Sequence, residues 1–244
     1  NIISECSSIL IFTFCLPKKN ISKNDFLPNK KYLKNILSIS LPSTGSRIIG
    51  NIGSFLEPII LTTVLLKIGY SNEFIIHEYG VLNGYVLPLL LLPSFFTMAI
   101  SQAIIPSVSK FHASHNKKGV KKVIKQAIIF SLVIGIPFTI LVELFPNFLL
   151  NSIYNAKEGS NYLRVFAPIF LFSYIQSPLT ATLQAMNKAK CAMNGTIIGI
   201  TLRTILLVIV SFFHIGIWSI IVAATSNILF VTFHHIFAIK NYTK

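Results

Sequence analysis

Long apolar stretches dominate this sequence, and short connections carrying most of the charge separate them. A helix that crosses a bilayer needs about 20 mostly apolar residues, and several stretches meet that length. Hydrophobic residues make up 53% of the chain and charged residues only 11%. A soluble domain carries about 25% charged residues, so this chain has too few to cover a surface that faces water. The sequence therefore predicts an all-α, polytopic membrane helical bundle.

The apolar stretches predict six complete spans, at residues 36–66, 80–108, 126–150, 164–186, 191–213 and 217–239. Residues 1–16 are also apolar, and we predict that they end a preceding transmembrane helix of a longer protein. Residues 17–35 are then a linker, and residues 36–244 form a C-terminal transmembrane lobe.

Lysines gather on alternate connections, at residues 17–35, 109–125 and 187–190 and in the tail from Lys240. The connections between them hold few basic residues, together with Glu73, Glu78 and Glu158. By the positive-inside rule, the lysine-rich loops and the C-terminus are predicted to be cytoplasmic in a multi-pass protein of the cell membrane. The lysines are dispersed without interleaved aromatic residues, which argues against nucleic acid as a partner.

The sequence contains no nucleotide-binding loop, no HExxH motif and no GxSxG motif. We therefore predict no catalytic residue, no metal ligand and no cofactor, and we do not expect an enzyme.

Charged residues within predicted spans are the candidates for function, because a charge at mid-membrane costs about 2.5–3.5 kcal/mol and faces the bundle interior or a wet cavity. The segment LPSTGSRIIGNIGSFLEPIILT at residues 41–62 carries Arg47 and Glu57, ten residues apart. On an ideal helix these two are about 15 Å apart and face about 80° away from each other, so they cannot form a simple ion pair. Each must find water, a substrate or a neighbouring helix. Arg203 lies near the middle of a later span, where pairing inside the bundle and lining of a cavity are both open.

Small and helix-breaking residues accompany these charges: Gly50, Asn51, Gly53 and Pro58. Small residues alone indicate close helix packing. With two charges and flanking prolines they favour an interrupted helix that lines a cavity, as in transporters. Gln102 is a further polar side chain in a predicted span, and it favours a polar lumen.

Two segments carry a family resemblance: LPSTGSRIIGNIGSFLEPIIL, and YGVLNGYVLPLLLLPSFFTMAISQAIIPSVSK at residues 79–110. With the lysine-rich loop that follows, they resemble the stage V sporulation protein B group, in the polysaccharide-flippase branch of the multidrug/oligosaccharidyl-lipid/polysaccharide exporter superfamily. The resemblance implies a fold of two six-helix lobes around a central cavity. This chain would supply the end of helix six and the whole second lobe, with the first lobe as its missing partner.

The resemblance also implies a function: flipping of lipid-linked oligosaccharides or peptidoglycan precursors for the cell wall or spore cortex, by alternating access. Arg47, with Arg203 as second candidate, would bind the pyrophosphate of the lipid-linked glycan. Glu57 would balance Arg47 in the empty state or bind a coupling cation. A proton, a sodium ion or the membrane potential could drive transport.

Two alternatives stay open from the sequence. One is a cation-coupled multidrug exporter of the same superfamily, whose cavity would be acidic and lined by aromatic residues. The other is a non-transporting membrane scaffold for wall synthesis, in which the cavity charges would be dispensable.

Overall fold

The computed structural model describes residues 2–15 and 30–243. Contacts divide the chain into two units, residues 1–37 and residues 38–244, which are described separately. The first unit holds helix α1 (Ile2–Cys15) and the first turns of α2 (Lys30–Lys67). Helix α1 has 14 residues, and its assignment to the end of a preceding span stays a prediction. Most of the predicted linker at residues 17–35 lies outside the described residues.

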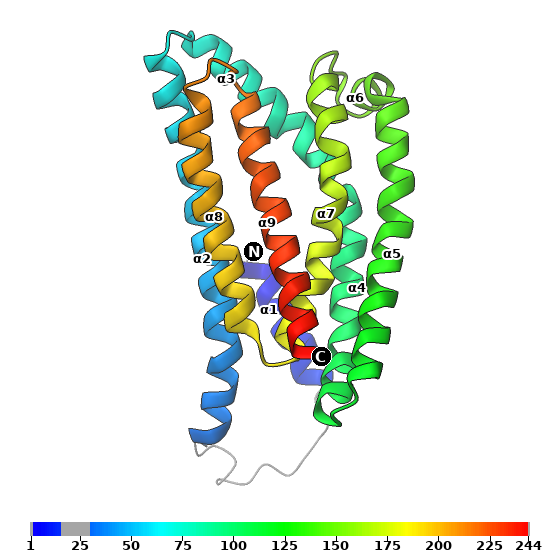
Figure 1. The fold of residues 1–244 in the computed structure, drawn as a ribbon. Coiled ribbons are helices and arrows are strands. Elements are labelled where there is room, and N and C mark those ends of the chain that lie inside the picture. Colours follow the sequence, from blue (N-terminus) through cyan, green and yellow to red (C-terminus); the bar gives the residue numbers. More distant parts are fainter. Residues whose placement is uncertain (1, 16–29, 244) are drawn as a thin grey trace. The chain divides into compact units, whose positions relative to one another are not determined.

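The second unit is built from helices, and the part of the chain that the structure describes contains no strand. Along the chain, α2 is followed by α3 (Asn72–Val81), the π-helical turn η2 (Leu82–Val86), α4 (Leu87–Ala113), α5 (Lys117–Leu144), α6 (Pro146–Tyr154), α7 (Ser160–Ala185), α8 (Ala189–Ser211) and α9 (Trp218–Thr243). Six helical stretches among the described residues are long and apolar enough to cross a membrane. The six predicted spans are thereby confirmed in number and order, and Figure 1 shows the long helices of this unit running alongside one another.

The second span is longer than the sequence predicted, running without a break from Asn72 to Ala113. It contains the π-helical turn η2, where the backbone N–H of Leu87 donates to the carbonyl of Leu82, five residues back. Pro88 follows directly in the first turn of α4, and a proline has no N–H to continue the regular pattern. In Figure 1, α3 is accordingly inclined to the axis of α4.

The third span also differs, because it begins at Lys117 and ends at Leu144 instead of covering residues 126–150. Asn116 caps its start by accepting a hydrogen bond from the N–H of Gly119 at 2.8 Å. Pro146 opens the short helix α6, since proline suits the first turn of a helix and interrupts the preceding one. The charges of residues 117–125 did not stop the helix, because lysines are good helix formers outside the apolar core.

Two apolar clusters form the core, one on each side of a polar zone. In the first cluster, the buried residues of α4 end at Leu90 and those of α7 end at Tyr174. In the second cluster, the buried residues of α4 begin at Ile104 and those of α7 begin at Leu179. Between these clusters both helices carry hydroxyl and amide side chains, and this zone holds the site described below.

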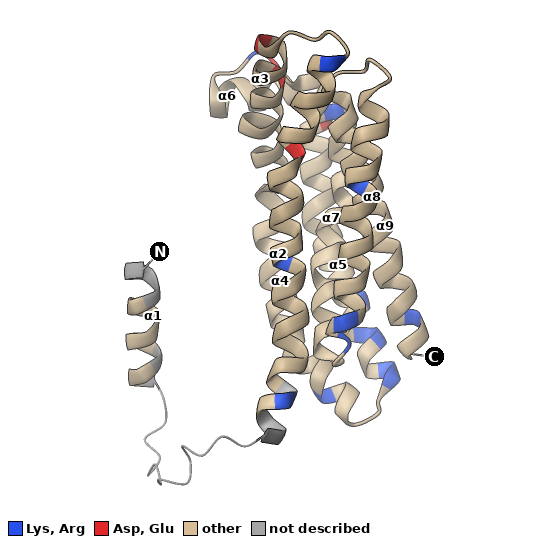
Figure 2. Ribbon diagram, turned by 90° about the vertical axis from the view of Figure 1, so that its left-hand side faces the viewer, with Lys and Arg blue, Asp and Glu red and all other residues tan. Residues whose placement is uncertain are grey.

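Lysines gather at one end of the second unit, here called the lysine-rich end, as Figure 2 shows. They lie at the end of α4, the start of α5, the turn between α7 and α8, and the end of α9. The acidic side chains Glu73, Glu78 and Glu158 lie at the opposite end, on α3 and before α7. The alternation expected from the sequence is therefore present in three dimensions, while the side of the membrane that each end faces stays a prediction.

Candidate functional site

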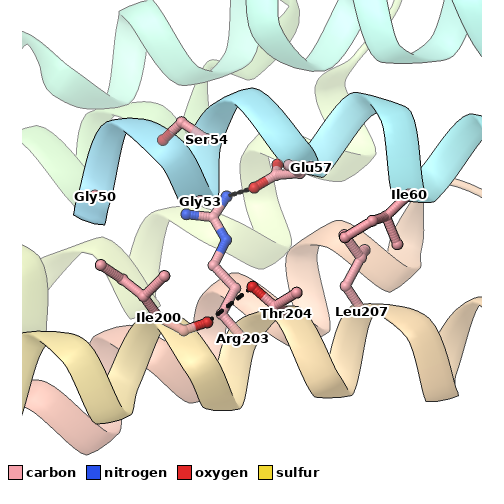
Figure 3. A pocket seen from close by; sticks show the side chains of 9 residues that line it. All are labelled: Gly50, Gly53, Ser54, Glu57, Ile60, Ile200, Arg203, Thr204 and Leu207. Carbon is pink, nitrogen blue, oxygen red and sulfur yellow. Dashed lines mark hydrogen bonds and ion pairs between the residues drawn. The ribbon is translucent and has the colours of Figure 1, made fainter. Parts of the chain in front are cut away.

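A cross-helix ion pair joins α2 to α8, as Figure 3 shows. The Nη2 atom of Arg203 contacts the Oε2 atom of Glu57. The Glu57 side chain is only 8% exposed and that of Arg203 is 29% exposed, so each charge meets its opposite where water is scarce. From the sequence we expected that Glu57 could balance the charge of Arg47, but the structure pairs Glu57 with Arg203.

Beside this pair, Gly53 on α2 leaves room for the side chain of Ile200 on α8. A Cβ atom added to Gly53 would lie 2.7 Å from Cγ2 of Ile200 on α8, and one added to Gly50 would lie 3.9 Å from Cδ1 of the same residue. The pocket beside the pair measures about 20 Å³, which is room for about one water molecule. Arg203 and Glu57 therefore have no space for a large ligand in this conformation.

Helix α2 is unbroken from Lys30 to Lys67, so the expected interruption between Arg47 and Pro58 is wrong. Pro42 and Pro58 both lie inside the helix. A proline removes one backbone hydrogen bond, but the other N–H and C=O groups of a helix in lipid still need partners and keep the helix together. Of the hinge candidates, Gly50 and Gly53 line the small pocket beside the ion pair, while Asn51 is exposed.

A larger cavity, of about 430 Å³, lies between α2, α4, α7 and α8. Its lining is mostly hydroxyl and amide side chains with a few apolar ones: Ser43, Ser46, Arg47, Ser94, Thr97, Met98, Ser101, Gln102, Ile105, Ser173, Gln176, Ser177, Thr180, Ala181, Gln184, Ala189, Ala192 and Thr196. Arg47 is the one charged side chain among these lining residues. We refer to this space as the polar cavity.

Hydrogen bonds hold the walls of the polar cavity in place. Ser101 donates to the carbonyl of Thr97 at 2.6 Å, and its Oγ lies 2.8 Å from Oγ of Ser177, which ties α4 to α7. Thr180 donates to the carbonyl of Gln176 at 2.9 Å and lies 3.3 Å from Nδ1 of the buried His235 on α9. The cavity thus has a defined polar wall with acceptor and donor capacity left over on its amides.

The predicted site residues separate into two groups. Arg47 and Gln102 line the polar cavity, whereas Glu57 and Arg203 form the ion pair beside the small pocket. Arg203, the second candidate for binding the same ligand as Arg47, does not line the polar cavity.

The serines and threonines of the polar cavity were not singled out from the sequence, although a signal was there. Ser94, Thr97 and Ser101 on α4 are spaced three and four residues apart, and α7 repeats this spacing from Ser173 to Gln184. Residues with that spacing share one face of a helix. A polar stripe on two otherwise apolar spans therefore predicts facing cavity walls.

The described residues 2–15 and 30–243 contain no group of three or more His, Cys, Asp or Glu side chains arranged to hold a metal ion.

Comparisons with known proteins show which family the chain belongs to. The MatE family model matches residues 84–210, and the model described as "Polysaccharide biosynthesis protein" matches residues 1–112. "Stage V sporulation protein B" of Bacillus subtilis (strain 168) is 31% identical over 242 residues, which cover 96% of this chain and 47% of that protein. "Lipid II flippase MurJ" of the same organism is 25% identical over 132 residues, 52% of this chain and 24% of the flippase. The matched region thus spans about half the length of the sporulation protein and about a quarter of the length of the flippase.

Solved structures share the fold. A crystal structure of MATE in the bent conformation has a TM-score of 0.79 at 17% identity, covering 97% of this chain and 54% of that one. An outward-facing multidrug resistance MATE family transporter of the MOP superfamily has a TM-score of 0.68 at 14% identity, covering 84% and 44%. At these identities the likeness shows the fold alone, and this chain matches about half of each solved chain.

Proposed function

Since the chain belongs to the MatE family, and thereby to the exporter superfamily that its sequence resembles, we propose that it forms one lobe of a flippase. The cargo is a lipid-linked oligosaccharide or peptidoglycan precursor for the cell wall or spore cortex. The missing first lobe closes the polar cavity from the other side, and the lobes rock about it to give alternating access. The protein moves its substrate without changing it chemically.

The observation that carries this proposal is the lining of the polar cavity. It joins one guanidinium to many hydroxyl and amide groups and contains no carboxylate. A planar guanidinium makes paired, charge-assisted hydrogen bonds to a pyrophosphate, and hydroxyl and amide groups suit the sugar. A cavity for cationic drugs would instead offer acidic side chains. The lining therefore supports an anionic, polyhydroxylated cargo over the multidrug alternative.

The source of energy is a further part of the proposal. A proton, a sodium ion or the membrane potential drives transport, and no cofactor takes part. Glu57 is a buried acidic side chain on a span, and it is paired with Arg203. A coupling cation at this position therefore competes with the guanidinium of Arg203.

The experiment is flipping of a fluorescent lipid-pyrophosphate glycan in proteoliposomes by the full-length protein. Arg47→Ala should slow flipping at least about tenfold, because it removes charge-assisted hydrogen bonds worth about 1.5–3 kcal/mol. Arg47→Lys should retain part of the rate, since lysine keeps the charge without the paired geometry.

The matched control is Arg164→Ala, which removes an exposed arginine that does not line the polar cavity. This variant should flip at the parental rate. Equal rates for the parent and Arg47→Ala would remove Arg47 from the substrate path. No flipping by a folded parent under any ion gradient would overturn the flippase proposal and leave the exporter or scaffold alternatives.

A further inference from the structure

A second hollow lies at the end of the second unit opposite the lysine-rich end, and it is distinct from the polar cavity. It measures about 320 Å³, within the range of small-molecule sites. We call it the α3–α7 groove, and its polar and aromatic lining includes Glu78, Lys157, Glu158, Asn161, Tyr162 and Trp218. A neighbouring hollow of about 420 Å³ shares Lys157 and Glu158 with it and adds His77.

Two aromatic rings form one wall of the groove. The rings of Tyr162 on α7 and Trp218 on α9 meet edge to face, with centroids 4.8 Å apart and planes inclined by 62°. Each is partly buried and so held in orientation while leaving part of its ring accessible. An indole offers a flat apolar face together with one N–H donor, which suits a ligand with both apolar and polar faces.

Carboxylates and an amide supply the polar part of the groove. The Tyr162 hydroxyl donates to Glu78, which fixes that carboxylate beside the aromatic wall. Nε2 of His77 lies 3.2 Å from Oε2 of Glu158, and its Nδ1 lies 3.6 Å from Oε1 of Glu78. Asn161 is exposed in the same lining. These groups accept and donate hydrogen bonds in pairs, as adjacent hydroxyls of a sugar require.

The loop before α7 is held against α3 and the π-helical turn η2. Gly159 has a φ of +92°, a conformation that favours glycine, and an added Cβ would lie 2.9 Å from Cγ1 of Val81. The groove is therefore a formed feature of the fold, with its carboxylates and rings already placed.

We infer that the α3–α7 groove binds an uncharged sugar unit, with the Trp218 ring packing on the sugar face and Glu78, Glu158 and Asn161 bonding its hydroxyls. Lys157 offsets part of the negative charge, and the groove has no arrangement of three metal-ligating side chains among the described residues. Both points disfavour a divalent cation. The inference deepens the proposed function, on which it rests for the presence of a glycan at this membrane face.

Trp218 is the only tryptophan of the 244-residue sequence, so its fluorescence reports on the groove directly. The chain in lipid nanodiscs is titrated with N,N′-diacetylchitobiose, a neutral disaccharide, and separately with glycerol and with calcium chloride. We expect a saturable change of Trp218 emission with the disaccharide alone. Glu158→Gln should raise its Kd at least about tenfold, because a charged acceptor becomes a neutral amide.

The matched control is Glu73→Gln, since Glu73 is an exposed glutamate on α3 that does not line the groove. It should leave the Kd unchanged, and circular dichroism is used to check that both variants keep the helical fold of the parent. No saturable signal from folded parent, an equal signal from glycerol, or saturation by calcium in place of the sugar would each overturn the groove assignment. Sugar binding without glycan flipping would support the groove and contradict the proposed function, whereas flipping without sugar binding would do the reverse.

Discussion

The buried pair of Glu57 and Arg203 shows how single residues constrain this molecule. A charge inside a bundle needs a partner, and neither side chain can reach water freely at 8% and 29% exposure. Their interaction ties α2 to α8 without a covalent link. The Nε atom of Arg203 is also buried, and it has no hydrogen-bond partner among the described residues. That atom and the water-sized pocket beside it indicate that the pair is not a fully satisfied network.

Removal of one partner should be more harmful than removal of both. Arg203→Met leaves the Glu57 carboxylate unpaired in the bundle, and breaking a buried pair in this way costs about 3 kcal/mol. The double variant Glu57→Gln/Arg203→Met should recover most of that loss, because no uncompensated charge remains. Thermal unfolding in detergent, followed by circular dichroism, measures both effects.

The control for the single and double variants is Arg164→Met, which removes an exposed arginine outside the ion pair. It should shift the unfolding midpoint little. A double variant as unstable as Arg203→Met alone would show that the two side chains act independently and not as a pair.

At the scale of elements, α8 and α9 pack through glycines. Gly195 and Gly199 on α8 face His234 and Val231 on α9, and a Cβ at either glycine would overlap those side chains. Small residues at such positions let helix backbones approach closely in a membrane, where apolar burial against lipid provides little driving force. The close α8–α9 contact therefore depends on the absence of a Cβ atom at Gly195 and Gly199.

Gly199→Ala should weaken the α8–α9 contact, since its methyl group would overlap Cγ2 of Val231. Overpacking of this kind costs about 1–3 kcal/mol. Gly80→Ala on α3 is the matched control, because an added Cβ there meets nothing within 4 Å. Alanine is the better helix former, so the control should be neutral or more stable by up to about 1 kcal/mol.

Chemical unfolding of both glycine variants in the same detergent tests this prediction. Equal stability of Gly199→Ala and Gly80→Ala would mean that α9 can shift to accept the methyl group, and the close packing would then not limit stability.

At the scale of the whole molecule, the charges predict how the second unit lies in the membrane. Lysines gather at one end and acidic residues at the other, as Figure 2 shows. Because lysine-rich connections stay on the cytoplasmic side, the end with the α3–α7 groove should face away from the cytoplasm. The polar cavity and the groove would then contact the cargo at different stages of its passage.

Single-cysteine labelling tests this orientation, after alanine replaces Cys6, Cys15 and Cys191. Asn72→Cys lies exposed at the start of α3, and Lys118→Cys lies exposed at the lysine-rich end. A membrane-impermeant maleimide added to intact cells should label the first variant, and should label the second only after permeabilisation. The reverse pattern would invert the proposed topology.

Local properties of the sequence were enough to predict the helical class, the number and order of spans, the alternation of lysines and the family. Hydropathy and charge act over about 20 neighbouring residues, so no knowledge of packing was needed. Helix ends were less accurate, because caps such as Asn116 and prolines such as Pro146 decide them over one or two residues.

The sequence by itself determined that Arg47 and Glu57 could not pair on one helix, since their spacing turns them to different faces. Only the tertiary structure decided that Glu57 pairs with Arg203, that Arg47 opens into a polar cavity, and that Trp218 meets Tyr162 beside two carboxylates. Each of these joins helices far apart along the chain. Their neighbours depend on how small residues and apolar faces pack, which no local stretch of sequence contains.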